Sequence, residues 1–270
     1  MSAGLVKPQG DMDFHPVEEN LRQSFRILAA RRERADVCEL DGISIASLGA
    51  SFQMFNAAFL NSFVEDEADL ERRIALAAVH FAKRDMDWAF WMCDAFLDRR
   101  LQRKAPRVFS RMGLTLSSEL PAMAAETLLK HTRRPPEIEI RPVCDERSRQ
   151  AFCDIGAVCF HVPIKWFEEV FDQRMNERPE FVSWLAWLDG EPVATAATVI
   201  AADAIGIYNV GTLPDHRGRG IGESLVRFAI DHAARESGIA RTVLQSTSYG
   251  YSLYRRMGYR VVGQVLVFSS

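Results

Sequence analysis

The sequence predicts a mixed α/β protein made of two tandem lobes, each a mixed, mostly antiparallel sheet flanked by helices. Two observations carry this prediction: short motifs recur in the same order in both halves, and each half contains an Asp-Gly pair between two apolar runs. A third is the midpoint segment HTRRPPEIEI, because Pro135-Pro136 cannot continue a helix. The predicted boundaries are an N-terminal lobe at residues 1–132, a linker at 133–136 and a C-terminal lobe at 137–270.

Four motifs repeat between the lobes at separations of 145 to 153 residues. An ancient duplication explains four repeats in one order better than coincidence in a chain rich in Ala and Arg. The repeats are Leu40-Asp41-Gly42 with Leu188-Asp189-Gly190, Phe55-Asn56 with Tyr208-Asn209, His80 with His232, and Arg111-Met112-Gly113 with Arg256-Met257-Gly258.

The N-terminal lobe is predicted to begin with a helix from Glu18 to Glu33, followed by a hairpin around Asp41-Gly42. Asp-Gly favours a two-residue hairpin turn, because both residues can adopt a positive φ. A further apolar strand, SFQMFNAAFL, precedes a long helix whose apolar side chains from Leu70 to Phe81 share one stripe. A strand (DWAFWMCD), a short helix ending at Arg111-Met112-Gly113 and a final strand complete the lobe.

The C-terminal lobe is predicted to repeat this order. Helices from Glu146 to Cys159 and from Trp166 to Met175 precede a hairpin, FVSWLAWL and EPVATAATVI, around Asp189-Gly190. The central strand AIGIYNVGTL leads into an amphipathic helix, with an apolar stripe from Ile221 to His232. The strand ARTVLQST, a short helix and a final strand follow, so both lobes have the same α/β pattern.

Composition excludes several classes of protein. The 33 Lys and Arg residues against 36 Asp and Glu residues give a formal charge of −3, which provides no general field for nucleic acid or an anionic membrane. The five cysteines form no C-x-x-C pair, which suits a reducing cytoplasm. The first residues, MSAGLVKPQGDMD, do not have the pattern of a signal peptide, and the most apolar stretch is too short to cross a membrane. We expect a cytoplasmic protein without nucleic-acid or membrane partners, and the sequence leaves its oligomeric state open.

The most informative segment follows the central strand of the C-terminal lobe, TLPDHRGRGIGESL. Gly218, Gly220 and Gly222 open the long helix, where glycines admit close approach of a ligand and unpaired N–H groups attract anions. Arg217 and Arg219 add positive charge. The corresponding segment of the N-terminal lobe, NSFVEDEADLER, has four carboxylates and no glycine, so we expect one anion site per chain. The alternatives are a basic surface turn and an RG-type contact to nucleic acid, of which the second conflicts with the net charge.

At this segment the sequence resembles the GCN5-related N-acetyltransferases (GNAT). Their acetyl-CoA motif is Arg or Gln, two residues, Gly, one residue, and Gly or Ala, and Arg217, Gly220 and Gly222 meet it. The preceding Thr212-Leu213-Pro214 is similar to the family's Val-x-Pro. A second family motif, Leu-Tyr followed by three residues and Gly-Phe, is matched by the run from Leu253 to Tyr259.

The resemblance covers about residues 137 to 269 and has two departures. Tyr259 stands where the family has Phe, and Thr247 stands where an Asn is frequent. The N-terminal lobe is similar to a degenerate copy of the same fold, because it lacks the loop and has Phe109 in place of the tyrosine of the second motif.

The resemblance implies transfer of an acetyl group, or of a longer acyl group, from acetyl-CoA to an amine, with no metal. Tyr254 would protonate the departing thiolate as general acid. The pantetheine arm would pair with the central strand, which should separate from the strand Thr242 to Ser246, and the Val210 N–H would stabilise the oxyanion. The implied CoA-binding residues are Val210, Gly211, Thr212, Arg217, Gly218, Arg219, Gly220, Ile221, Gly222 and Thr247.

The sequence leaves the general base open, because the central strand IGIYNVGT has no carboxylate. A water chain, Tyr208, Glu168, Glu169 and Asp172 are all candidates. The alternative function is a non-enzymatic CoA-binding or regulatory scaffold with the tandem fold. An intact Tyr254 beside an intact loop favours the enzyme.

Most other polar side chains of note are predicted to be structural. Asn209 either contacts substrate or makes a structural hydrogen bond, since Asn56 occupies the matching place in the other lobe. The other structural predictions are core positions for His80 and His232, an auxiliary contact for His216, buried apolar positions for Cys153 and Cys159, and a solvated helix end for Arg31 to Arg34.

Overall fold

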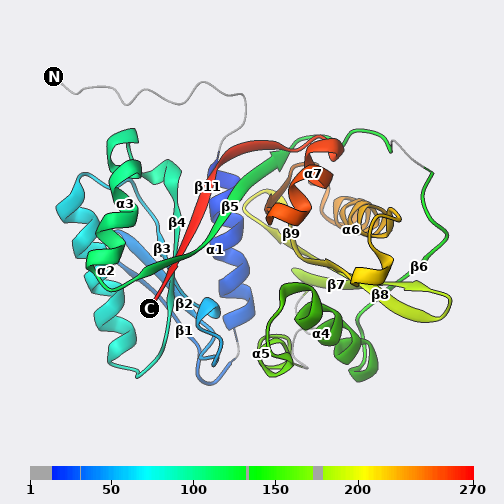
Figure 1. Cartoon of the computed structure of the whole chain (residues 1–270), viewed down its shortest axis with the longest axis horizontal. Helices are drawn as coiled ribbons and strands as arrows, with labels where there is room; N and C mark the ends of the chain where they lie inside the picture. Colours follow the sequence, from blue (N-terminus) through cyan, green and yellow to red (C-terminus); the bar gives the residue numbers. More distant parts are fainter. Residues whose placement is uncertain (1–13, 31, 132–133, 173–178) are drawn as a thin grey trace.

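The computed structural model describes residues 14–30, 32–131, 134–172 and 179–270. Within these residues the chain forms one eleven-stranded sheet with the strand order β1-β2-β3-β4-β11-β5-β10-β9-β8-β7-β6, and helices pack against it (Figure 1). The predicted α/β class is therefore confirmed. None of the helices in this part of the chain combines the length and the apolar character needed to span a bilayer.

The N-terminal lobe has the predicted order of elements after a first helix that begins at His15. They are α1 (His15–Ala29), β1 (Asp36–Leu40), β2 (Ile43–Ser47), the 3-10 turn η1 (Gln53–Phe55), β3 (Asn56–Leu60), α2 (Glu67–Ala82), β4 (Ala89–Cys93), η2 (Asp94–Phe96), α3 (Arg99–Arg111) and β5 (Thr115–Ala125).

The C-terminal lobe adds one strand that the sequence did not predict, β6, at the edge of the sheet. The second of its predicted helices is shorter than expected and ends at Val170, and Met175 lies outside the described residues. The elements are β6 (Glu139–Pro142), α4 (Glu146–Phe160), α5 (Ile164–Val170), β7 (Phe181–Leu188), β8 (Glu191–Ala201), β9 (Ala204–Thr212), η4 (Pro214–His216), α6 (Ile221–Ser237), β10 (Thr242–Gln245), α7 (Ser248–Met257) and β11 (Arg260–Ser269).

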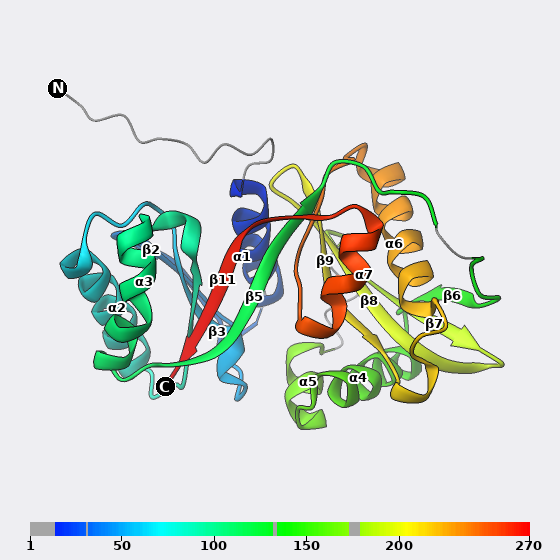
Figure 2. The ribbon, with the colours of Figure 1, turned by 45° about the horizontal axis from the view of Figure 1, so that its top comes forward.

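The two lobes exchange their final strands. β5 pairs with β10 of the C-terminal lobe, and β11 pairs with β4 of the N-terminal lobe. β5 and β11 also pair with each other, antiparallel, and run side by side through the middle of the molecule (Figures 1 and 2). The predicted linker at 133–136 therefore does not divide the sheet, whose hydrogen bonding joins strands from both sides of it.

Both predicted Asp-Gly hairpins form, with different turns. Asp189 and Gly190 have φ angles of +51° and +86°, as expected for a turn with two left-handed residues. In the first hairpin Gly42 has a φ of +82°, whereas Asp41 is not among the residues with positive φ. Leu40 still pairs with Ile43 across the turn, so the hairpin has the predicted two-residue loop. The conformation of that loop differs from the predicted one.

Helix α1 of the N-terminal lobe is anchored in the C-terminal lobe through Asn20. The Asn20 amide donates to the carbonyls of Val199, Ala201 and Ala204 at 2.9 to 3.2 Å, and its Oδ1 accepts from the Tyr208 hydroxyl at 2.8 Å. The approach is close, because a Cβ at Gly206 would lie 1.9 Å from Asn20 Oδ1. The helix is thus part of both lobes.

Arg32 corrects the expectation of a solvated arginine run. Its side chain is 11% exposed and bridges to the α5 region, donating to the carbonyl of Glu169 at 2.7 Å and to Asp172 Oδ2 at 3.1 Å. Phe52 stacks on Trp166 nearby, with ring centroids 4.6 Å apart. These contacts and the shared sheet join the lobes into one structure.

Glu18 of α1 is a buried carboxyl that sequence reasoning missed. It is 5% exposed, and burial raises its pKa to about 7, although Arg22 lies 3.0 Å away and opposes the shift. A folded-state pKa above the unfolded value of 4.5 means that the native state holds a proton which the unfolded chain releases. This stabilisation is complete below pH 4.5 and is lost as the pH rises through 7.

Glu18→Gln should therefore flatten the pH dependence of stability. Between pH 5 and pH 8 the free energy of unfolding of the wild type should fall by up to about 3 kcal/mol relative to the variant. Denaturant midpoints at both pH values measure the difference. Glu19→Gln, at the exposed neighbouring position, is the control, and parallel profiles for the wild type and Glu18→Gln would show that burial does not shift this carboxyl.

Candidate active site

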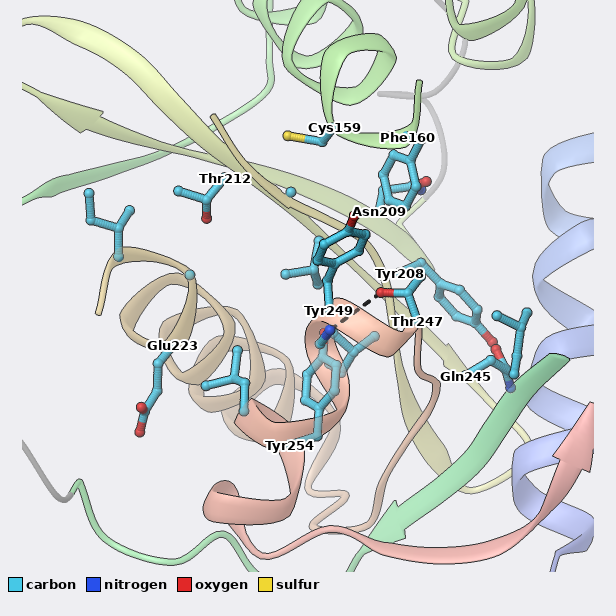
Figure 3. Close-up of a pocket in the computed structure, with 18 of the residues that line it drawn as sticks. Cys159, Phe160, Tyr208, Asn209, Thr212, Glu223, Gln245, Thr247, Tyr249 and Tyr254 are labelled. Carbon is cyan, nitrogen blue, oxygen red and sulfur yellow. Dashed lines mark hydrogen bonds between the residues drawn. The ribbon is translucent and has the colours of Figure 1, made fainter. Parts of the chain in front are cut away.

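A cavity of about 770 Å³ lies where α1, β9, α6 and α7 meet. Figure 3 shows Thr212 and Glu223 on one side of it and Tyr208 and Gln245 on the side of α1. Of the predicted site residues, all but Arg219 line this cavity. Those that do are Val210, Gly211, Thr212, Arg217, Gly218, Gly220, Ile221, Gly222, Thr247 and Tyr254.

The cavity opens between two strands that separate. β9 and β10 pair in parallel only where Ile205 lies opposite Thr242 and Gly206 opposite Val243. β10 continues against β5 through Gln245, while β9 continues against β8 through Thr212. The predicted separation of the strands is confirmed, and it leaves the edge of β9 beyond Gly206 without a strand partner on the side of β10.

A β-bulge shapes this free edge. Asn209 has a φ of +50°, and the register of β9 on β8 shifts between Thr195 and Ala197. Thr195 Oγ1 donates to the Asn209 carbonyl at 2.8 Å and fixes the bulge. Val210 consequently has no partner residue on β8, which leaves its backbone outside the regular ladder.

The glycine-rich loop brings the start of α6 to the same cavity. Gly218 and Gly220 have φ angles of +74° and +81°, a region that favours glycine, and no side chain caps the first turn of α6. A Cβ at Gly222 would lie 3.1 Å from Thr212 Oγ1, so the loop packs closely on β9. The free N–H groups of a helix start attract anions such as phosphate.

The two arginines of the loop differ in position. Arg217 lines the cavity, donates from Nε to the Thr212 carbonyl at 2.9 Å and lies 5.9 Å from the Tyr249 ring centroid. Arg219 is not part of the cavity wall, and its guanidinium lies 3.4 Å from His216 Nδ1. The sequence did not distinguish them, because neither spacing nor charge shows which residue faces inward.

In the N-terminal lobe the corresponding loop is used for helix stability. Asp66 caps α2 and accepts from the Asp69 N–H at 2.8 Å. Glu67 pairs with Lys104 at 2.7 Å and with Arg111 at 2.6 Å, contacts that hold its pKa at about 2. A helix start whose N–H groups are capped and whose carboxylates are negatively charged does not bind an anion. We call a helix start whose free N–H groups can bind an anion, such as that of α6, a cradle.

Tyr254 lies in the wall of the cavity on α7. Its side chain is 6% exposed, and burial raises the pKa of its hydroxyl above the usual range, so the group is protonated at neutral pH. The ring packs over Gly250, where a Cβ would lie 2.8 Å from Cε2, and meets Tyr259 edge to face at 5.6 Å. A protonated hydroxyl on a fixed ring can donate a proton into the cavity.

None of the carboxylates considered as general base lines the cavity. Glu168 accepts from Gln150 at 2.9 Å, Glu169 accepts from the Ser51 N–H at 2.9 Å, and Asp172 pairs with Arg32. The Tyr208 hydroxyl donates to Asn20, and burial raises its pKa, so it is a poor base. Of the five candidates for the general base, this leaves the water chain.

Asn209 and Asn56 differ in environment despite their matching positions. Asn56 is fully buried and bonds to Ser47, to both backbone groups of Ala50 and to the Asp87 carbonyl. The Asn209 side chain lines the cavity, which favours the substrate contact over the structural bond. Asn56 is the structural residue of the pair.

His80 and Cys153 are buried as predicted, whereas His232 and Cys159 are only half-buried, which corrects their predicted core positions. His80 is buried with Nε2 3.1 Å from Asp36, and half-buried His232 packs on Trp184 at 4.8 Å. Burial raises the pKa of the Cys153 thiol to about 12, which makes it a poor nucleophile. Cys159 is half-buried and lines the cavity next to Gly211, and burial raises the pKa of its thiol too.

The N-terminal lobe forms a large part of the cavity wall that the sequence did not predict. We call this part, together with Phe160, Val162, Phe167 and Phe181 of the C-terminal lobe, the distal chamber. It is lined by Leu21, Ser24, Phe25, Leu28, Phe52, Met54, Phe55, Trp91, Ser118, Leu120, Phe160, Val162, Phe167 and Phe181. The residues come from six separate segments, and only the fold brings them together.

A split pair of strands beside a glycine-rich helix start is typical of the acyl-CoA-dependent acetyltransferases. The sequence model of the Acetyltransferase (GNAT) family matches residues 144–259, which lie within the C-terminal lobe. Members of the family use acetyl-CoA as cosubstrate. A comparison with curated proteins finds no match.

Solved structures share the fold over nearly the whole chain. A GCN5-related N-acetyltransferase from Kribbella flavida has a TM-score of 0.68 at 21% identity, covering 91% of this chain and 95% of its own. A functionally unknown conserved protein from Staphylococcus epidermidis has a TM-score of 0.66 at 14% identity, covering 89% and 95%. A GCN5-related N-acetyltransferase from Sphaerobacter thermophilus has a TM-score of 0.55 at 15% identity, covering 85% and 76%. The fold of both lobes together therefore occurs in other proteins.

Proposed function

We propose that the protein transfers an acetyl group from acetyl-CoA to an amine by direct attack, at one site per chain in the C-terminal lobe. The observation that carries the proposal is the convergence on one cavity of the unpaired edge of β9, the uncapped start of α6 and the Tyr254 hydroxyl. The N-terminal lobe is a degenerate copy that has lost its cradle and supports the site structurally.

The cradle holds the pyrophosphate of CoA. The first N–H groups of α6 and the loop from Arg217 to Gly222 supply donors and positive charge. The pantetheine arm extends along β9 and pairs with backbone groups of Val210 and Thr212, in the place that a neighbouring strand would occupy. The thioester then lies close to Tyr254 and to the bulge at Asn209.

The chemistry needs one new bond and one broken bond. The amine nitrogen attacks the thioester carbonyl carbon, and the Val210 N–H stabilises the oxyanion that develops on the carbonyl oxygen. When the C–S bond breaks, Tyr254 gives its proton to the thiolate. The proton released by the nitrogen returns to the tyrosinate through water, so no metal takes part in any step of this proposal.

Gly220→Val tests the cradle. A side chain there would occupy the space that the pyrophosphate needs, and its positive φ adds backbone strain, so acetyl-CoA affinity should fall at least about 100-fold. Gly190→Val is the matched control, because Gly190 has a φ of +86° in a hairpin turn with open space around it. Calorimetry should show one acetyl-CoA per chain for the wild type and the control.

Two results would contradict the proposal. A stoichiometry of two, or equal affinity in the two glycine variants, would place the cofactor elsewhere. Binding of acetyl-CoA with no thiol released on any amine would favour the non-enzymatic scaffold instead.

A further inference from the structure

The distal chamber has an unusual chemical character for a site that would receive an amine. Phe25, Phe55 and Trp91 meet one another there, with ring centroids 5.2 to 5.4 Å apart around Phe25. The Trp91 N–H is used internally, since Nε1 donates to the Met54 carbonyl at 3.1 Å. The rings therefore present apolar surface to the chamber.

None of the residues assigned to the chamber has a charged side chain, and Glu223, a carboxylate in the wall of the same cavity, lies on the side away from α1 (Figure 3). Its few polar groups include Ser24, whose hydroxyl donates to the Leu21 carbonyl at 2.7 Å, and Ser118. The Tyr208 hydroxyl at its boundary donates to Asn20. The chamber thus has neither a carboxylate to pair with an ammonium ion nor a base to remove its extra proton.

From these observations, and on the basis of the proposed acetyl transfer, we infer that the acceptor is an arylamine: a flat apolar molecule whose nitrogen is uncharged at neutral pH. An alkylammonium ion would lose its hydration in the chamber without gaining an ionic partner. An arylamine loses little hydration free energy on entering the chamber, because its nitrogen is uncharged. Its lone pair is delocalised into the ring, so the nitrogen carries no extra proton. Its ring matches the aromatic wall.

The proton balance of the reaction agrees with this assignment. A neutral amine loses one proton after it attacks the thioester, and the departing sulfur gains one, so the site needs no separate base. An alkylammonium ion must first lose an additional proton, and none of the described lining residues of the chamber can accept it.

The rings could instead attract a cation through their faces. The arrangement argues against this, because Phe25 and Phe55 stack on each other with an interplanar angle of 27° and cover one face of each ring. Aniline and cyclohexylamine separate the two possibilities, since they have rings of the same size and only the second is an ammonium ion at pH 7.

The test measures binding of both amines to the CoA-loaded protein by calorimetry at pH 7, and then their acetylation between pH 6 and 8.5. Aniline should bind at least about tenfold more tightly, with an acetylation rate nearly independent of pH. The rate with cyclohexylamine should rise about tenfold per pH unit, in parallel with the fraction of free base. Equal or tighter binding of cyclohexylamine, or binding of neither amine, would overturn the inference.

A charge placed in the chamber provides a second test. Ser118 of β5 lines the chamber and is half-buried, so Ser118→Asp should fold and should reduce the preference for aniline about tenfold by pairing with the ammonium ion. Ser117→Asp is the matched control on the exposed face of the same strand. An unchanged preference in Ser118→Asp would contradict the electrostatic basis of the inference.

The tests separate this inference from the proposed function. If aniline binds but no thiol is released from acetyl-CoA, the proposed acetyl transfer is contradicted, while the preference of the chamber for a neutral aromatic amine is supported. If cyclohexylamine is acetylated efficiently at pH 7, the proposed acetyl transfer is supported, while the inference that the acceptor is an arylamine is contradicted.

Discussion

Tyr254→Phe should reduce turnover by roughly 10²–10⁴-fold, the usual contribution of a general acid, while acetyl-CoA affinity stays unchanged. The substitution removes one hydroxyl and keeps the ring that packs over Gly250 and against Tyr259. The Tyr254 hydroxyl carries its proton across the neutral range, and the thiolate that forms beside it in the cavity is a strong enough base to take that proton. Steady-state thiol release and calorimetry together measure the two quantities.

Tyr259→Phe is the matched control for this variant. Tyr259 is the neighbouring buried tyrosine but is not among the residues that line the cavity, so removal of its hydroxyl should leave turnover nearly unchanged. The N-terminal lobe supports tolerance of the ring, since Phe109 fills the matching place and stacks on Phe268 at 3.8 Å. A loss of only two- or threefold in Tyr254→Phe would mean that water supplies the proton. A collapse of acetyl-CoA affinity would make the hydroxyl a ligand contact.

A fragment of residues 134–270 should fail to fold, although it contains the whole family match. It lacks β5, so β10 and β11 would both lose the strand between them, together with buried side chains such as Met123. Each large apolar side chain lost from the core costs roughly 2–3 kcal/mol, and a domain has only about 5–15 kcal/mol of stability in total. We expect the fragment in the insoluble fraction after expression.

Extension of the fragment to residues 113–270 restores β5 and provides the control. This longer fragment should yield severalfold more soluble protein with a measurable thermal transition, because β10, β5 and β11 can then pair as in the full chain. A fragment of residues 134–270 that is soluble, monomeric and fully active would show that the lobes are only tethered and that the strand exchange contributes little.

Most elements could be predicted because their causes are local. Each of these features is formed by residues that are close together in the sequence. Examples are the apolar stripe from Leu70 to Phe81, the glycine-rich start of α6 and the two Asp-Gly turns. The partners of β5 and β11 could not be predicted, because periodicity shows that a segment is a strand and which face is apolar, but not its neighbour in the sheet. The short strand β6 has too few residues for a periodic signal.

The cofactor side of the site could be predicted much better than the acceptor side. The loop from Arg217 to Gly222 is a contiguous motif with a direct physical meaning, and ten of the eleven predicted site residues line one cavity. The bulge at Asn209 was missed, because an Asn at positive φ within a strand has no signal beyond the residue itself. Trp91 and Phe25 were missed because apolar residues from separate segments are indistinguishable from ordinary core residues until the fold is known.

The exchanged strands also have a consequence for the order in which the protein can be assembled during translation. β1 to β4 leave the ribosome first, but the neighbour that completes them beside β4 is β11, and all of residues 94–259 are made in between. Through that interval the edge of β4 is an open template to which other nascent strands could pair. The N-terminal half must therefore wait for the end of the C-terminal half, so folding should be slow and largely post-translational, as expected when contacts join residues far apart in sequence.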